Sequence, residues 1–133
     1  MKKIPSGTWI LVADGEEARL FRNAGSDYTL SLEQVDMFKS SDAPHEGPSG
    51  HRPPESDTQA TGEATFAKQL SNRLNAAALH NAYEHLVLMA DPQTLGQIRP
   101  QLHMQTERRI IGEVAKTFSN APLEDIQNAL HDA

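Results

Sequence analysis

Three acidic side chains offer the clearest chemistry in this sequence. Asp14 follows the apolar run Trp9 to Ala13, Asp91 follows the apolar run His85 to Ala90, and Glu63 stands at the start of a helical pattern. If the two runs are neighbouring parallel strands, Asp14 and Asp91 emerge at the same edge of the sheet, with Glu63 nearby. Carboxylates grouped in this way could bind Mg²⁺ for two-metal phosphodiester chemistry.

Ordinary local structure explains each of these carboxylates as well. Asp14 stands before Gly15 in a turn sequence, and Asp91 stands before Pro92 where a helix N-cap is expected. Glu63 lies near a helix start, where acidic side chains are favoured anyway. We therefore predict no metal, no cofactor and no catalytic residue, and we keep Asp14, Glu63 and Asp91 as the ligands of an alternative metal site.

Basic side chains are the second group that could form a site. Arg19 and Arg99 could contact RNA phosphate if they share a face, and His51 with Arg52 could contact an anion or a partner. The formal charge of −6 disfavours non-specific binding to a phosphate backbone, so solvated charge is the alternative explanation. Together with Asp14, these four residues are the candidate binding residues.

The remaining composition mainly excludes functions. The chain has no cysteine, so disulfides, thiolate nucleophiles and cysteine-based zinc sites are excluded. Its six histidines include no pair at the helical spacing of a zinc protease, and no phosphate-binding glycine loop is present. No apolar run approaches the length of a membrane span, and the N-terminus lacks the apolar region of a signal peptide. We therefore expect a cytoplasmic protein.

The first part of the chain has the patterns of three strands. Trp9 to Ala13 is apolar throughout and predicts a central strand that is buried on both faces. The turn at Asp14 and Gly15 returns the chain as an antiparallel strand over Ala18 to Asn23. Tyr28 to Lys39 predicts a third, half-exposed strand, in which a change of alternation indicates a bulge or bend near Gln34.

A long loop separates these strands from the rest of the chain. Ser40 to Gly62 contains almost no large apolar residue and many prolines and glycines, so we predict a mobile loop. Loops of this length are either functional or disordered connectors, and both explanations stay open.

Helices and strands alternate after the loop. We predict the following elements: a helix from about Thr61 to Asn81, which Asp57 or Thr58 could cap at an earlier start; a strand over His85 to Ala90 beside the first strand; a short helix from Asp91 to Arg99; a helical turn within Leu102 to Arg108; a strand over Arg109 to Ala115; and a helix from Pro122 to His131. This order predicts one α/β domain over residues 1–133. It has a mixed five-stranded sheet, helices on both faces and a ribonuclease H-like arrangement.

Three segments carry a resemblance to a known family. WILVADGEEARLFR, HLVLMADPQTLGQIRPQL and RRIIGEVAKTFSNAPLEDIQNAL resemble the host attachment family, whose fold is related to the middle domain of archaeal and eukaryotic peptide-release factors. The resemblance implies the fold predicted above. Release factors carry a Gly-Gly-Gln tripeptide on the loop of this domain, and the loop Ser40 to Gly62 has none, so peptide release by that chemistry is not expected.

The resemblance favours a non-enzymatic binding or adaptor protein that acts indirectly in host attachment from the cytoplasm, through a partner that the sequence does not identify. The first alternative is a ribosome- or RNA-associated translation factor. The second is a metal-dependent nuclease. The sequence leaves the oligomeric state open.

Overall fold

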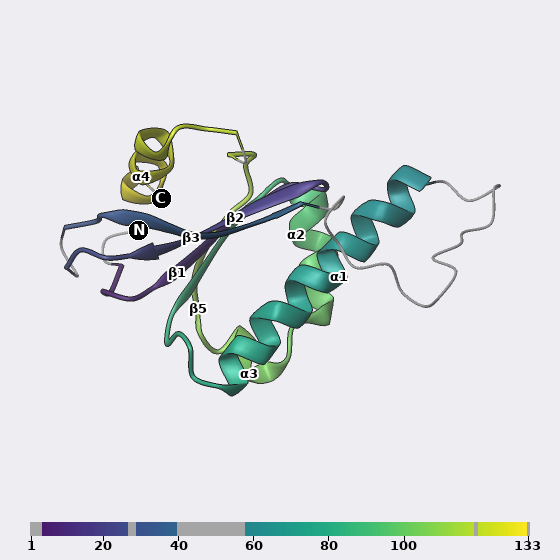
Figure 1. Ribbon diagram of the computed structural model, residues 1–133, viewed down its shortest axis with the longest axis horizontal. Coiled ribbons are helices and arrows are strands. Elements are labelled where there is room, and N and C mark those ends of the chain that lie inside the picture. The colour runs from purple at the N-terminus through teal and green to yellow at the C-terminus, as the bar shows by residue number, and fades with distance from the viewer. Residues whose placement is uncertain (1–3, 27–28, 40–57, 119, 133) are drawn as a thin grey trace.

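The computed structural model describes residues 4–26, 29–39, 58–118 and 120–132, without the side chains of 58–64 and 132 (Figure 1). The strands are β1 Trp9–Ala13, β2 Glu17–Asn23, β3 Leu32–Lys39, β4 Leu86–Ala90 and β5 Ile110–Val114. The helices are α1 Thr58–Leu79, α2 Pro92–Ile98, the 3₁₀ turn η2 Arg99–Gln101, α3 Met104–Glu107 and α4 Leu123–Asp132.

The sheet is mixed, five-stranded and ordered β3-β2-β1-β4-β5. β1 pairs antiparallel with β2 and parallel with β4, so it is the central strand and the later apolar run lies beside it. All five residues of β4 are buried, as are four of the five in β1, because helices cover both faces of this pair. The predicted fold class is confirmed.

The strand β3 is shorter than predicted but contains the predicted bulge. Leu20 of β2 faces Asp36 and the next residue, Phe21, faces Gln34, so Val35 is the extra residue at the bulge. The strand begins later than predicted because the chain before it turns: the Ser26 N–H donates to the Thr29 carbonyl at 3.1 Å.

Helix α1 corrects the predicted end of the loop. The helix begins at Thr58, so residues 58–62 are helical, and residues 40–57 of the predicted loop lie outside the described residues. The period of the apolar residues identified the body of the helix. The stretch before Phe66 contains only small and polar residues, so the main prediction began the helix at Thr61, and the observed start agrees with the alternative of an earlier start capped by Asp57 or Thr58.

Two apolar cores lie on opposite faces of the sheet. On one face, α1 and α2 pack Leu70, Leu74 and Leu95 against Leu11 and Leu88. On the other face, α4 packs against the sheet through the two residues Ile126 and Leu130; its sheet neighbours are Ile10, Val12, Phe21, Leu32, Val87 and Met89. Figure 1 shows α4 on one side of the sheet and α1 and α2 on the other.

Most other predicted boundaries shift by one or two residues. The short helix α2 ends at Ile98, and Pro100 lies within the 3₁₀ turn η2 that follows it. Pro100 is tolerated there because it stands at the second position of the turn, where its missing N–H has no helical partner to lose. None of the helices in the described part of the chain is long and apolar enough to cross a membrane.

Candidate functional site

The carboxyl ends of β1 and β4 meet at the acidic corner that the sequence predicted. Ala13 and Ala90 are partners in the parallel register, so Asp14 and Asp91 follow on adjacent strands. The structure therefore brings these two acidic residues to the same edge of the sheet. The side chain of Glu63 lies outside the described residues.

Both carboxylates at this corner make local structural hydrogen bonds. Oδ1 of Asp14 accepts from the N–H groups of Glu16 and Glu17 at 2.7 and 2.8 Å, which closes the β1–β2 turn. Asp91 caps α2: Oδ2 accepts from the Thr94 N–H at 3.1 Å, and Oδ1 accepts from the Thr94 hydroxyl at 2.7 Å. No three His, Asp or Glu side chains of the described residues are grouped as a metal site requires. The geometry thus supports the turn and cap explanations.

Arg19 points into the protein. Its Nη2 donates to the carbonyls of Phe118 and Ala121 at 2.9 and 2.7 Å, and its guanidinium lies 5.4 Å from the Phe21 ring centre. These bonds hold the segment before α4 against the sheet, so Arg19 has a structural role that its sequence position did not reveal.

Arg99 lies on the other side of the sheet. It forms an ion pair with Glu113 of β5. Glu113 is the cross-strand partner of Leu88, and Leu88 belongs to the core on the α1 side of the sheet, the α1-side core. Arg19 is the neighbour of Val12, which belongs to the α4-side core. Because cross-strand neighbours share a face, the structure does not bring Arg19 and Arg99 together. His51 and Arg52 lie outside the described residues.

An aromatic cluster at the amino ends of the central strands was not identified from the sequence. The rings of Trp9 and Tyr83 stack with centres 4.7 Å apart and planes at 29°. Arg109 donates to the Tyr83 carbonyl and, at 3.0 Å, to Oδ1 of Asn81. These residues are far apart in the chain, and only the pairing of β1 with β4 and of β4 with β5 could have indicated that they meet.

Tyr83 is the titratable group that this cluster perturbs. Its side chain is buried and its hydroxyl donates to the Leu74 carbonyl at 2.8 Å. Burial raises the pKa of Tyr83 above its ordinary value of 10.0, against smaller lowering effects from Thr106 and the Arg109 charge. The phenol is therefore neutral at physiological pH.

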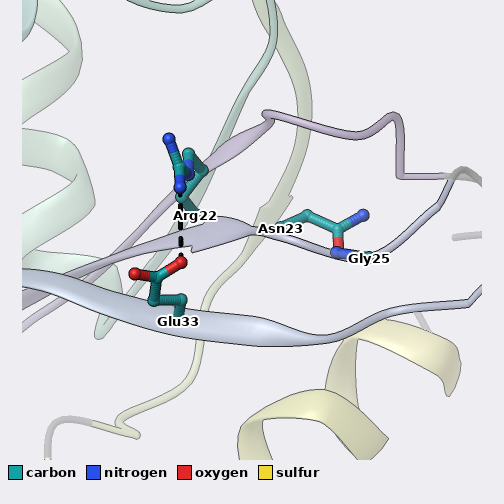
Figure 2. A network of polar contacts seen from close by, with 4 residues as sticks. All are labelled: Arg22, Asn23, Gly25 and Glu33. Atoms are coloured by element: carbon teal, nitrogen blue, oxygen red, sulfur yellow. Dashed lines mark hydrogen bonds and ion pairs between the residues drawn. The ribbon is translucent and has the colours of Figure 1, made fainter.

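Arg22 lies beside Trp9 on the sheet. The two residues are partners in the β1–β2 register, and Arg22 pairs with Glu33 of β3 at 3.3 Å (Figure 2). The arginine and glutamate side chains are 49% and 55% exposed. An ion pair this exposed adds little stability, so Arg22 can exchange its partner at low cost.

Asn23, next to Arg22, faces inward instead. Its Oδ1 accepts from the N–H groups of Gly25 and Ser31, both at 3.0 Å, and its Nδ2 donates to the Ile4 carbonyl at 2.9 Å. Figure 2 shows the contact with Gly25. The buried amide thereby joins the N-terminal segment to the β2–β3 turn.

Comparisons with known proteins find solved structures that match this chain and a family model that matches most of it. The crystal structure of an archaeal translation termination factor, aRF1, matches with a TM-score of 0.49 and 12% identity; the match covers 94% of this chain and 39% of that one. A search among curated proteins finds no match. The model of bacterial archaeo-eukaryotic release factor family 12 matches residues 7–130.

The family match corrects the expected function. None of these comparisons supports the resemblance to the host attachment family, and the predicted adaptor role in host attachment is wrong because the matching model describes a release-factor family. The relationship to release factors, which was part of the same resemblance, is confirmed. The match extends over nearly the whole sequence, and the chain accordingly belongs to bacterial archaeo-eukaryotic release factor family 12.

Proposed function

We propose that this protein acts in translation by binding the ribosome. The observation that carries the proposal is membership of a release-factor family, with the match running from residue 7 to residue 130. A chain that acts in translation works where ribosomes are, so we place it in the cytoplasm, and we propose that residues 1–133 act as one domain.

The proposed activity is binding without ester hydrolysis by the Gly-Gly-Gln chemistry. The sequence contains no two adjacent glycines, so that tripeptide is absent. The one Gly-Gln pair, Gly96 and Gln97, lies inside α2, where its backbone is held in a helix. A helical Gly-Gln pair does not offer the loop that reaches a peptidyl ester.

Ribosome co-sedimentation tests the proposal. The purified protein is centrifuged with bacterial ribosomes through a sucrose cushion at low and at high salt. We expect it to pellet with ribosomes at low salt and to be released as salt rises, because contacts between cationic side chains and RNA phosphate weaken with ionic strength. Absence from the ribosome pellet at low salt would reject the proposal.

A release assay tests the second part. Ribosomes that hold a labelled peptidyl-tRNA at a stop codon are incubated with the protein, and a functional release factor serves as the positive control. We expect no peptide release above the rate without added protein. Release at a rate close to the positive control would show that another group supplies the chemistry.

A further inference from the structure

We propose that the amino ends of the central strands form a contact surface for single-stranded RNA, with Trp9 as the stacking residue and Arg22 and Arg108 as the phosphate contacts. This inference rests on the proposed ribosome binding and names the surface that would serve it. We call these three residues the Trp9 surface.

The aromatic part of the surface is held in place by the core. Trp9 is partly exposed, whereas its stacking partner Tyr83 is only 3% exposed and is fixed by its hydrogen bond to Leu74. Arg109 lies over the Tyr83 ring at 5.8 Å and bonds to its carbonyl. A tryptophan that is supported from behind loses little freedom when a base stacks on it, and base stacking on aromatic rings tolerates any sequence.

The basic part follows from the register of the sheet. Arg22 is the partner of Trp9 on β2, and on the other side Trp9 faces Leu86, whose N–H donates to the Arg109 carbonyl. Adjacent strands are about 4.8 Å apart, so Arg22 and the start of β5 lie roughly 15 Å apart on either side of Trp9. Arg108 is exposed directly before this point. Cations on both sides of a stacking ring can bind the two phosphates that flank a stacked base in single-stranded RNA.

The other end of the central strands is unsuited to RNA. Acidic residues lie at this end: the β1–β2 turn carries Asp14, Glu16 and Glu17, and Asp91 follows β4. Their carboxylates repel phosphate, and Arg19, which lies nearby, is turned toward the carbonyls of Phe118 and Ala121. The partly exposed ring of Trp9, with Arg22 and Arg108 on its two sides, therefore favours the amino ends of the central strands as the RNA contact.

Trp9 provides its own probe because it is the only tryptophan in the chain. Titration with single-stranded oligoadenylate at low salt should quench its fluorescence in a saturable way, and added salt should reverse the quenching. Trp9→Leu should weaken ribosome co-sedimentation roughly 5- to 150-fold, which is the effect of losing one stacked base.

Substitutions at two exposed arginines test the RNA contact without changing the apolar core. The double variant with Arg22→Gln and Arg108→Gln removes both phosphate contacts without touching the Trp9–Tyr83 stack. It should weaken both the oligoadenylate affinity and the co-sedimentation and should reduce the salt dependence. Lys116→Gln, an exposed cation beyond the opposite end of β5, is the matched control and should bind like the wild type.

The outcomes separate the two proposals. If wild type and all variants pellet equally with ribosomes, or if oligoadenylate leaves Trp9 fluorescence unchanged, the Trp9 surface is wrong and ribosome binding uses another face. If the wild type does not pellet at all, the proposed function fails, and this inference fails with it. Loss of binding in the double variant but not in Lys116→Gln supports the surface.

Discussion

Asn23 shows how one buried polar residue can organise two connections. It is 1% exposed, and its amide donates to the Ile4 and Ser26 carbonyls while accepting two backbone N–H groups. A buried amide that lost these partners would leave several polar groups unsatisfied, at about 1–3 kcal/mol each. The chain around Asn23 must therefore keep the conformation that satisfies this side chain, and Gly25 is part of that conformation.

Gly25→Ala should destabilise the protein by about 1–3 kcal/mol, as overpacking of a fixed site does. A Cβ atom at this position would lie 2.1 Å from the Thr29 carbonyl oxygen, so the turn would have to open and the bonds to Asn23 would stretch. Urea unfolding gives the change in the free energy of unfolding. Gly96→Ala is the control: it is helical with nothing within 4 Å, so it should be neutral or stabilising. Equal effects of the two substitutions would contradict the packing argument.

Tyr83 should make the protein less stable in strong alkali. Because burial raises its pKa above 10.0, the folded state holds the phenol proton more tightly than the unfolded state does. The corresponding stability is complete below pH 10 and is lost as pH rises through the folded pKa.

Tyrosinate absorbance measures this directly. In a Tyr28→Phe background Tyr83 is the only tyrosine, so the absorbance change on alkaline titration reports its pKa. Tyr83→Phe should lose about 1 kcal/mol with the hydrogen bond to Leu74, and its stability should fall less steeply above pH 10. Ionisation of Tyr83 at or below pH 10 in the folded protein would show that its burial has no effect.

At the scale of the elements, β3 is an edge strand with features that oppose pairing to another chain. Five of its eight residues in succession are exposed, from Glu33 to Met37, and Val35 and Met37 are apolar. The bulge at Val35 interrupts the ladder, and the Asp36 carboxylate accepts the Met37 N–H at 2.8 Å. An incoming strand would have to compete with Asp36 for this N–H group, and charged side chains on an edge discourage such pairing.

Asp36→Val should therefore promote self-association. The substitution frees the Met37 N–H and joins Val35 and Met37 into one apolar stretch on the edge. We expect a concentration-dependent rise in mass by analytical ultracentrifugation. Glu16→Val, which removes an exposed carboxylate from the β1–β2 turn, is the control for the charge change and should behave like the wild type. Similar masses for all three proteins would show that Asp36 does not protect the edge.

Across the whole molecule, the sequence was sufficient to predict those elements whose burial leaves a run or an alternation of apolar residues. The apolar runs of β1 and β4 predicted their central position, and the change in alternation predicted the bulge of β3. The main prediction began α1 too late because small and polar residues carry no such pattern, and only the possible caps Asp57 and Thr58 indicated the earlier start. The relation between Arg19 and Arg99 depends on register across several strands, which no local pattern contains.

The candidate site shows the same limit. The sequence placed Asp14 and Asp91 at one edge correctly because two parallel strands imply it, but the roles of their carboxylates depend on backbone N–H groups that only the structure reveals. The stacking of Trp9 on Tyr83 joins residues 74 positions apart, so no motif could indicate it. The three segments that resemble a known family indicated the relationship to release factors but named the wrong family, and the match over residues 7–130 shows the right one.

The two cores should unfold together because both include residues of β1 and β4, which face alternately to one core and to the other. Trp9 packs on the α1-side core and Ile126 on the α4-side core. A substitution of Ile126 therefore shifts the unfolding transition seen by Trp9 fluorescence only if both cores unfold in one cooperative step. Ile126→Ala should cost about 2–5 kcal/mol and lower the midpoint of the Trp9 fluorescence transition by as much as that of circular dichroism.

Leu123→Ala, on the same helix but 40% exposed, should change both midpoints little. If Ile126→Ala lowered the circular dichroism midpoint while the Trp9 transition stayed in place, α4 would unfold as a separate unit. Coincident shifts would instead mean that the Trp9 surface keeps its geometry only while α4 is docked, because the strands that position Trp9 and Arg22 have α4 packed on their opposite face.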